Sequence, residues 1–244
     1  MNLSQNSLVN QSFKIVDLTH PLSSHIPTWN GSCGFCLEIK KDYDKMFRVQ
    51  QIKMHAGLGT HMDAPSHRIP GGNSIAEIPL EQLIVPACVI DVSAQADADY
   101  EVSIEDIENY EKEYGKIPQS SLVIAYTGWS RYWSCSDAYR NVDGKGQMHF
   151  PAFSATSAQW LLRRDVAGIA IDTLSPDCLD QTFPVHKTIL GAGKYIIENI
   201  ANCSQIPPHG SLVMALPLRA QEATESPVRI ACLIPFPKTC EKSH

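Results

Sequence analysis

Seven short segments rich in valine, isoleucine and aromatic residues recur between turn-forming residues, and this pattern constrains the possible folds more than any other feature of the chain. We predict that each segment is a β-strand. They cover residues 13–18, 47–54, 83–92, 122–127, 166–171, 212–216 and 228–234.

Two helices are predicted between these strands, and each begins at a residue suited to cap it. Ser103 precedes IEDIENYEKEY, which Gly115 ends, and Ser154 precedes ATSAQWLLRR. Serine is favoured at a helix N-cap and glycine after the last turn. Because each helix leads into a strand, the alternation favours an α/β or mixed α+β class with helices packed on a sheet. The length favours one domain over residues 1–244.

Composition narrows the classes of function. A hydrophobic fraction of 43% and a formal charge of -6 are typical of a soluble globular protein and argue against a nucleic-acid partner. No stretch approaches the roughly 20 apolar residues that span a bilayer, and we expect a cytoplasmic protein without a membrane partner. The eight cysteines are scattered, so we expect reduced thiols. Cys33 and Cys36 form a single CxxC, which we interpret as loop or strand residues, with a zinc knuckle or redox motif as the alternative.

The segment MHAGLGTHMDAPSH gathers His55, His61, Asp63 and His67. If GTHMD is extended, His61 and Asp63 project to the same side. An imidazole and a carboxylate on one face are suitable ligands for zinc, manganese or iron. The alternative is a hydrogen-bonded polar turn, and spacing alone leaves both open.

A second group lies in the C-terminal third. His186 and Glu198 stand in FPVHKTILGAGKYIIENI, where Glu198 is either a buried carboxylate that needs a cation or donors, or a surface residue on a helix. Asp172 ends the strand segment GIAID, where α/β proteins often place site residues, but it could equally form a turn with Thr173 and Ser175.

Taken together, these motifs resemble the cyclase-like metal hydrolase family, which includes bacterial kynurenine formamidases (arylformamidases) and isatin hydrolases. The resemblance runs through VDLTHPLSSHIPTW, GTHMDAPSH, YTGWSRYW, FPAFSATSAQWLLRRDVAGIAIDTLSPD and FPVHKTILGAGKYIIEN. It implies a swivelling β/α/β-type domain, a homodimer or homotetramer, and a centre of one or two divalent ions, with zinc or manganese expected.

The resemblance also implies roles for individual residues. His61, Asp63, His186 and Glu198 match the metal ligands, and His67 resembles the catalytic acid/base. The family pattern HxGTHxDxPxH places a histidine four residues before His61, where this chain has Gly57. Our hypothesis is that His55, two residues earlier, reaches the metal instead.

The activity implied is that of a metal-dependent amidohydrolase acting on a small amide through activated water. An arylformamidase would convert N-formylkynurenine to kynurenine and formate, and Trp29 is the candidate aromatic wall for such a substrate. The alternatives are another cyclic amide or lactone, such as isatin, and a catalytically silent metal-binding or ligand-binding homologue.

Overall fold

Eight strands form one mixed sheet that closes on itself. In this computed structural model, which describes residues 12–32 and 34–236, the strand order is β1-β12-β11-β5-β7-β9-β10-β4. A further pairing of β12 with β4 joins all of these strands except β1 into a barrel-like ring. The strands are β1 (Phe13–Asp17), β4 (His61–Asp63), β5 (Ile84–Asp91), β7 (Leu122–Tyr126), β9 (Gly168–Ile171), β10 (Tyr195–Glu198), β11 (Ser211–Pro217) and β12 (Glu225–Pro235).

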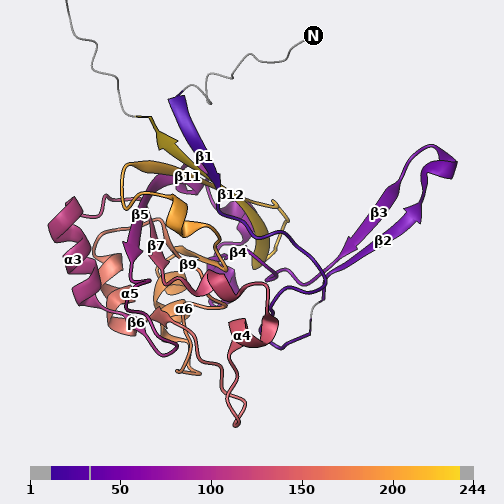
Figure 1. Ribbon diagram of the computed structural model, residues 1–244. Helices are drawn as coiled ribbons and strands as arrows, with labels where there is room; N and C mark the ends of the chain where they lie inside the picture. Colours follow the sequence, from indigo (N-terminus) through magenta and orange to yellow (C-terminus); the bar gives the residue numbers. More distant parts are fainter. Residues whose placement is uncertain (1–11, 33, 237–244) are drawn as a thin grey trace, which may run out of the picture.

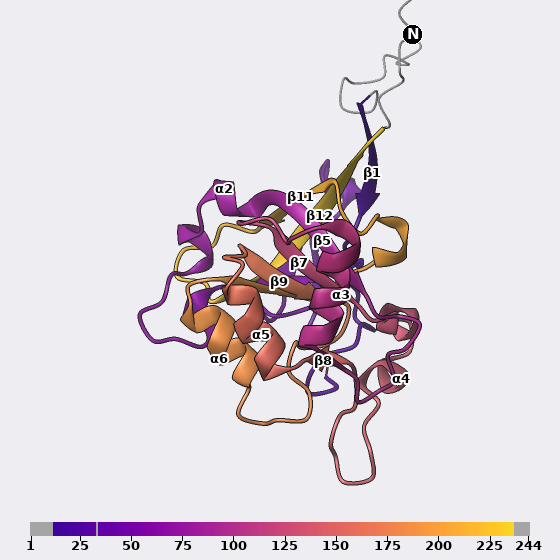
Figure 2. The same cartoon turned by 90° about the vertical axis from the view of Figure 1, so that its left-hand side faces the viewer.

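Helices cover one outer side of the ring, where the strands run parallel. β5, β7, β9 and β10 pair in parallel. Figure 2 shows α3, α5 and α6 lying over this side. These helices are α3 (Ile104–Tyr114), α5 (Ala155–Leu162) and α6 (Pro184–Gly191). Such an arrangement buries both faces of the parallel strands, which explains why every residue of β9 is buried.

The core has two parts because side chains alternate along each strand. Val85, Ala87 and Val89 of β5 point into the ring and join one buried cluster. Cys88 and Ile90 point outward and pack in a second cluster beneath the helices. The mixed α/β class predicted from the sequence is therefore the class observed.

Both predicted helices are confirmed together with their caps. The Ser103 side chain accepts a hydrogen bond from the Asp106 N–H, and α3 ends at Gly115, whose φ of 91° is suited to glycine. The Ser154 side chain accepts from the Ser157 N–H at the start of α5. All seven predicted strands are also present, although their ends differ by up to three residues.

A long hairpin projects from the body (Figure 1). It consists of β2 (Cys36–Lys41) and β3 (Val49–Lys53), all of whose residues are exposed. β3 lies in the predicted strand over residues 47–54, whereas β2 was not predicted. Cys36 lies at the start of β2, and Cys33 lies outside the described residues.

The remaining elements are short. The strands β6 (Glu101–Val102) and β8 (Ala152–Phe153) pair in parallel as a separate two-stranded sheet. Two helices, α2 (Leu80–Leu83) and α4 (Ser136–Arg140), and single 3-10 turns fill the connections. The turns cover Tyr43–Lys45, Pro65–His67, Ile75–Glu77, Trp129–Tyr132 and Cys203–Gln205. Among the described helices, none is long and apolar enough to cross a membrane.

Candidate metal centre

The three-residue strand β4 brings the candidate ligands together because it lies between β10 and β12. Glu198 of β10 pairs with His61, and Glu225 of β12 pairs with Asp63. Residues directly opposite in antiparallel strands project from the same face. Since Met62 points into the core of the ring, these four side chains point outward, toward α6. Of the run GTHMD, only HMD forms a strand, which is enough to place His61 and Asp63 on the same side; Gly59, with a φ of 67°, lies in a bend before it.

His61 is oriented so that one ring nitrogen faces the carboxylates. Its Nδ1 lies 2.9 Å from the Gly59 carbonyl oxygen, which can only accept, so Nδ1 carries the proton. Nε2 then lies 3.5 Å from Asp63 Oδ1 and 3.3 Å from Glu198 Oε2. Burial works to lower the pKa of His61, but the charges of Asp63 and Glu198 raise it above its ordinary value.

His186 approaches the same carboxylates from α6. Its Nδ1 lies 2.7 Å from Asp177 Oδ2, and Asp177 also accepts the backbone N–H groups of Val185 and His186 at the start of the helix. The other nitrogen, Nε2, lies 3.6 Å from Asp63 Oδ2 and 3.4 Å from Glu198 Oε1. Although burial opposes it, contact with the surrounding carboxylates raises the pKa of His186 to about 12.

One oxygen of the central carboxylate Asp63 lacks a hydrogen donor, which is a sign of a cation site. Asp63 is 1% exposed, and its Oδ1 has no hydrogen-bond partner. Burial and the charge of Asp63 raise the pKa of Glu198, whereas contact with His186 and the charge of His61 hold the pKa of Asp63 below its usual range despite burial. An unpaired buried carboxylate is costly, and imidazole nitrogens facing it match the donors that zinc, manganese and iron prefer. These residues therefore fit a divalent metal ion.

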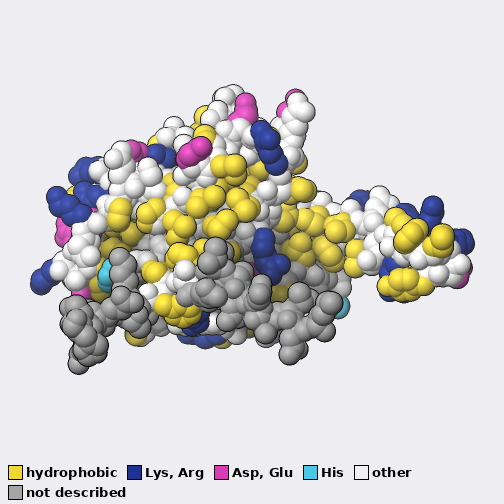
Figure 3. All heavy atoms as spheres, turned by 90° about the horizontal axis from the view of Figure 1, so that it is seen from above, with side chains coloured by type: hydrophobic (Ala, Val, Ile, Leu, Met, Phe, Trp, Pro, Cys, Tyr) yellow, Lys and Arg dark blue, Asp and Glu magenta, His cyan; other side chains and the backbone are white. Residues whose placement is uncertain are grey.

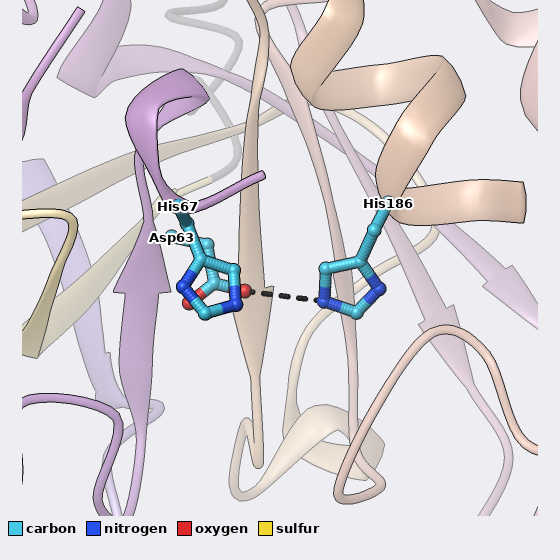
Figure 4. A group of neighbouring side chains, drawn as sticks. All are labelled: Asp63, His67 and His186. Carbon is cyan, nitrogen blue, oxygen red and sulfur yellow. Dashed lines mark ion pairs between the residues drawn. The ribbon is translucent and has the colours of Figure 1, made fainter. Parts of the chain in front are cut away.

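His67 lies at the edge of this cluster, in the 3-10 turn that follows β4. Figure 4 shows its ring pointing toward Asp63 and His186, and its centroid lies 5.9 Å from that of His186. Its side chain is 32% exposed, so solvent and substrate can reach it. Nδ1 lies 3.4 Å from Glu225 Oε2, and this contact raises the pKa of His67 although burial opposes it.

Two sets of donor atoms are close enough to hold an ion. One consists of Asp63, His67 and His186, and the other of His61, Asp63 and Glu225. The ligand atoms in each set lie within 4.8 Å of one another. Because Asp63 belongs to both sets, the arrangement suits two neighbouring ion positions that share its carboxylate.

The structure does not bring His55 to this cluster. His55 is exposed at the base of the hairpin, and its ring lies beside Gly34, where an added Cβ would meet its Cδ2 at 2.4 Å. Glu225 enters the cluster although no local motif marks it. Only the pairing of β12 with β4 identifies it, together with its position in the sequence ATESPVR before the predicted strand.

A cavity of about 300 Å³ opens above the cluster. Trp29 lines it and is 40% exposed, with its ring centroid 5.9 Å from that of Phe183 and 6.4 Å from that of Phe150. A planar aromatic group suits such a wall. The volume lies at the lower end of the range for small-molecule pockets, about 300–1,000 Å³. The cavity is lined by Trp29, Gly57, His61, Asp63, His67, Arg68, His186, Glu198 and Glu225, with neighbouring residues.

Asp172 has a structural environment outside this cavity. It is fully buried, and it accepts hydrogen bonds from the backbone and hydroxyl of Thr127 and from the Ser130 N–H. Burial raises the pKa of its carboxyl group. These contacts tie the end of β7 to the end of β9, and they differ from both the site role and the turn with Thr173 and Ser175 that the sequence left open.

The closed mixed sheet and the His/Asp/Glu cluster at the foot of an aromatic-walled cavity define a hydrolase-type metal centre. A family model described as "Putative cyclase" matches residues 16–178, more than half of the chain, and the protein belongs to this family. The isatin hydrolase of Roseibium aggregatum is 26% identical over 249 residues, covering 93% of this chain and 94% of that protein. The kynurenine formamidase of Bacillus cytotoxicus is 26% identical over 217 residues, covering 88% and 94%.

Solved structures agree with this assignment. Isatin hydrolase A from Labrenzia aggregata superposes with a TM-score of 0.87 at 31% identity, covering 94% of this chain and 96% of that one. The enzyme of the same name from Ralstonia solanacearum gives 0.85 at 30% identity, covering 91% and 92%. The predicted family and fold class are confirmed, and the protein is a hydrolase.

Proposed function

We propose that this protein is a metal-dependent amidohydrolase that cleaves a small amide of an aromatic amine with an activated water molecule. One observation carries the proposal. The Nε2 atoms of His61 and His186 converge on the buried carboxylates of Asp63 and Glu198, at the foot of a cavity with an aromatic wall.

His61, Asp63, His186 and Glu198 would hold the ion, which we propose to be zinc or manganese. A divalent ion held there would supply Lewis acidity, which polarises the substrate carbonyl and lowers the pKa of water at the site toward neutral. The hydrogen bonds of the two histidines to Gly59 and Asp177 fix their rings and leave Nε2 free to coordinate.

His67 is placed to move the proton. Its ring contacts the cluster on one side and is open to the cavity on the other. It would take a proton from the attacking water and return it to the nitrogen that leaves. Trp29 would hold the aromatic ring of the substrate against the cavity wall.

Two substrates follow from the named relatives. Hydrolysis of N-formylkynurenine breaks the bond between formyl carbon and nitrogen and gives kynurenine and formate. Hydrolysis of isatin breaks the ring bond between C2 and nitrogen and gives a carboxylate and a free aromatic amine. Because the similarity extends to two solved isatin hydrolases at 30% and 31% identity, the cyclic amide is the first substrate to test.

The decisive experiment measures turnover of both substrates by metal-replete protein, chelated protein and the His67→Gln variant. We expect hydrolysis that chelation abolishes and that added Mn²⁺ or Zn²⁺ restores. We expect His67→Gln to lower kcat by about 10²–10⁴-fold, the usual contribution of a general acid/base. Bound metal without turnover of formamides, isatins or lactones would instead indicate the catalytically silent homologue.

We further propose a homodimer or homotetramer that acts in the cytoplasm on a small-molecule substrate, without nucleic acid or membrane as a partner. The apolar hairpin supports self-association, since Met46 and Phe47 at its tip are 80% and 70% exposed. A reducing compartment agrees with the six described cysteines, all of which are free thiols.

A further inference from the structure

The space beside Gly57 is occupied by another residue's carboxylate. A Cβ added at Gly57 would meet Glu225 Oε1 at 2.1 Å and Glu225 Cδ at 3.1 Å, and it would lie 3.3 Å from His61 Nε2. The backbone of Gly57 is outside the left-handed region that favours glycine. The backbone conformation therefore does not require glycine at position 57. The absence of a side chain there makes room for the Glu225 carboxylate.

From this geometry we infer that Glu225 is a metal ligand, which takes the place that a side chain at position 57 would otherwise fill and completes an ion position with His61 and Asp63. The inference rests on the proposed function, because it assumes that the cluster binds a divalent ion. Under this inference, Glu225 replaces the first histidine of the HxGTHxDxPxH pattern, which this chain lacks. His55 is not needed as a replacement and lies outside the cluster.

Three observations support coordination by Glu225. Its carboxylate has an oxygen within 4.8 Å of ligand atoms of both His61 and Asp63. The strand register holds it opposite Asp63, whose buried Oδ1 has no hydrogen-bond partner. Its other oxygen, Oε2, lies 3.4 Å from His67 Nδ1, so Oε1 is the oxygen that faces His61 and the space beside Gly57.

The exchange of an imidazole for a carboxylate changes the character of the ion position. One imidazole and two carboxylates form a harder and more negative ligand set than two imidazoles and one carboxylate. Hard oxygen ligands suit manganese better than zinc, whereas imidazole suits zinc. We therefore expect the position at Glu225 to favour Mn²⁺ relative to a site with histidine at position 57.

The test compares metal binding, rather than activity, in the wild type and in variants of Glu225. Titration calorimetry with Mn²⁺ and Zn²⁺ measures the affinity, and mass spectrometry measures the metal content. We expect Glu225→Gln and Glu225→Ala to lower the affinity for one of the bound ions by about 100-fold or more. Mutation of a residue that only supports a ligand typically lowers metal affinity about 10–100-fold. Glu225→Asp keeps the charge but withdraws the carboxylate by one methylene, so it should weaken the same equivalent. Glu222→Gln, an exposed residue on the same connection, is the matched control and should bind like the wild type.

Position 57 provides an independent check. Gly57→His alone should weaken metal binding, because the new side chain and the Glu225 carboxylate compete for one space. The Gly57→His/Glu225→Ala double variant should again bind the ion that each single variant binds weakly, and it should prefer Zn²⁺ over Mn²⁺ more than the wild type does. The effects of the two substitutions on metal affinity would then be strongly non-additive. The visible spectrum of the Co²⁺-loaded protein should change with each change of ligand.

One result would overturn the inference about Glu225, and a different result would overturn the proposed function on which it rests. Wild-type stoichiometry and affinity in both Glu225→Gln and Glu225→Ala would show that Glu225 is not a ligand and serves only to position His67. Failure of the wild-type protein itself to bind any divalent metal would instead remove the proposed function.

Discussion

At the scale of single residues, the centre depends on groups that orient the histidines from behind. The carbonyl oxygen of Gly59 and the carboxylate of Asp177 each accept the Nδ1 hydrogen of a histidine, so that Nε2 faces the cluster. Such contacts select one tautomer and one ring orientation before any ion arrives. Asp177 has a second role, because it also binds the first N–H groups of α6.

We predict that Asp177→Asn weakens metal binding about 10–100-fold while leaving every proposed ligand in place. The amide can no longer provide a full negative charge behind His186, and its NH₂ group cannot accept the Nδ1 hydrogen. Calorimetric titration with Mn²⁺ or Zn²⁺ measures the effect. Asp180→Asn, which changes an exposed carboxylate three residues away, is the control. Equal affinities for the two variants would show that Asp177 matters only for the helix end.

The sequence indicates the residues that stand in compact motifs and misses those that depend on tertiary contacts. His61, Asp63 and His67 lie within seven residues of one another, so spacing alone brings them to attention. Asp177 and Glu225 acquire their positions only from the start of α6 and from the pairing of β12 with β4. His55 shows the converse limit, because the hypothesis that it reaches the metal assumed an extended run before His61. The chain instead bends at residues 56–57 and 59–60, and His55 lies exposed at the base of the hairpin.

At the scale of elements, the same distinction separates the predicted from the unpredicted strands. The apolar strands are detectable because their burial follows from local composition, as in LVIAY and GIAI. β4, with the sequence HMD, has too little apolar pattern to be recognised and is a strand only because β10 and β12 flank it. α6 begins after Phe183, whose φ is 53°, and its proline at the first turn is the signal that sequence inspection could have used.

A second element-scale contact ties α3 to the segment between α5 and β9. Both oxygens of Glu111 accept hydrogen bonds from Arg164, at 2.6 and 2.7 Å, and the Glu111 side chain is 12% exposed. The hydrogen bond from Arg164 holds the pKa of Glu111 below its ordinary value, against the effect of burial. The pair therefore stabilises the folded state only while Glu111 is ionised.

The stabilisation by the Glu111–Arg164 pair depends on pH. Because the folded-state pKa lies below the unfolded value of about 4.3, the stabilisation is complete above that value and is lost as pH falls through the folded pKa. We expect Glu111→Gln to lower the free energy of unfolding by about 1–2 kcal/mol at neutral pH, with a difference that shrinks in acid. Urea unfolding at a series of pH values tests this, with Glu113→Gln at an exposed position of the same helix as control. A difference that stays constant into acid would show that the ion pair is not its source.

At the scale of the whole molecule, the hairpin is the feature that the single chain leaves unexplained. Figure 3 shows apolar side chains on this projecting arm, far from the core. Several of its large apolar residues are 45–80% exposed: Leu37, Ile39, Tyr43, Met46, Phe47, Val49 and Ile52. An isolated two-stranded hairpin is marginally stable in water, and contiguous apolar surface on a soluble protein usually marks an interface. A second copy of the chain would supply the cover that the body of the same molecule does not.

We therefore predict a homo-oligomer in solution whose assembly depends on this arm. Replacing Phe47 and Ile52 by glutamate places charges in the expected interface, where their desolvation is unfavourable, and should shift the protein to monomers. Light scattering coupled to size-exclusion chromatography at micromolar concentration measures the mass, and Lys45→Glu in the same turn tests for a general effect of charge. Because the metal ligands lie on β4, β10, β12 and α6, the monomeric variant should keep its metal. A wild-type protein that is already monomeric would refute assembly through the arm, and loss of metal in the double variant would show that the arm also supports the centre.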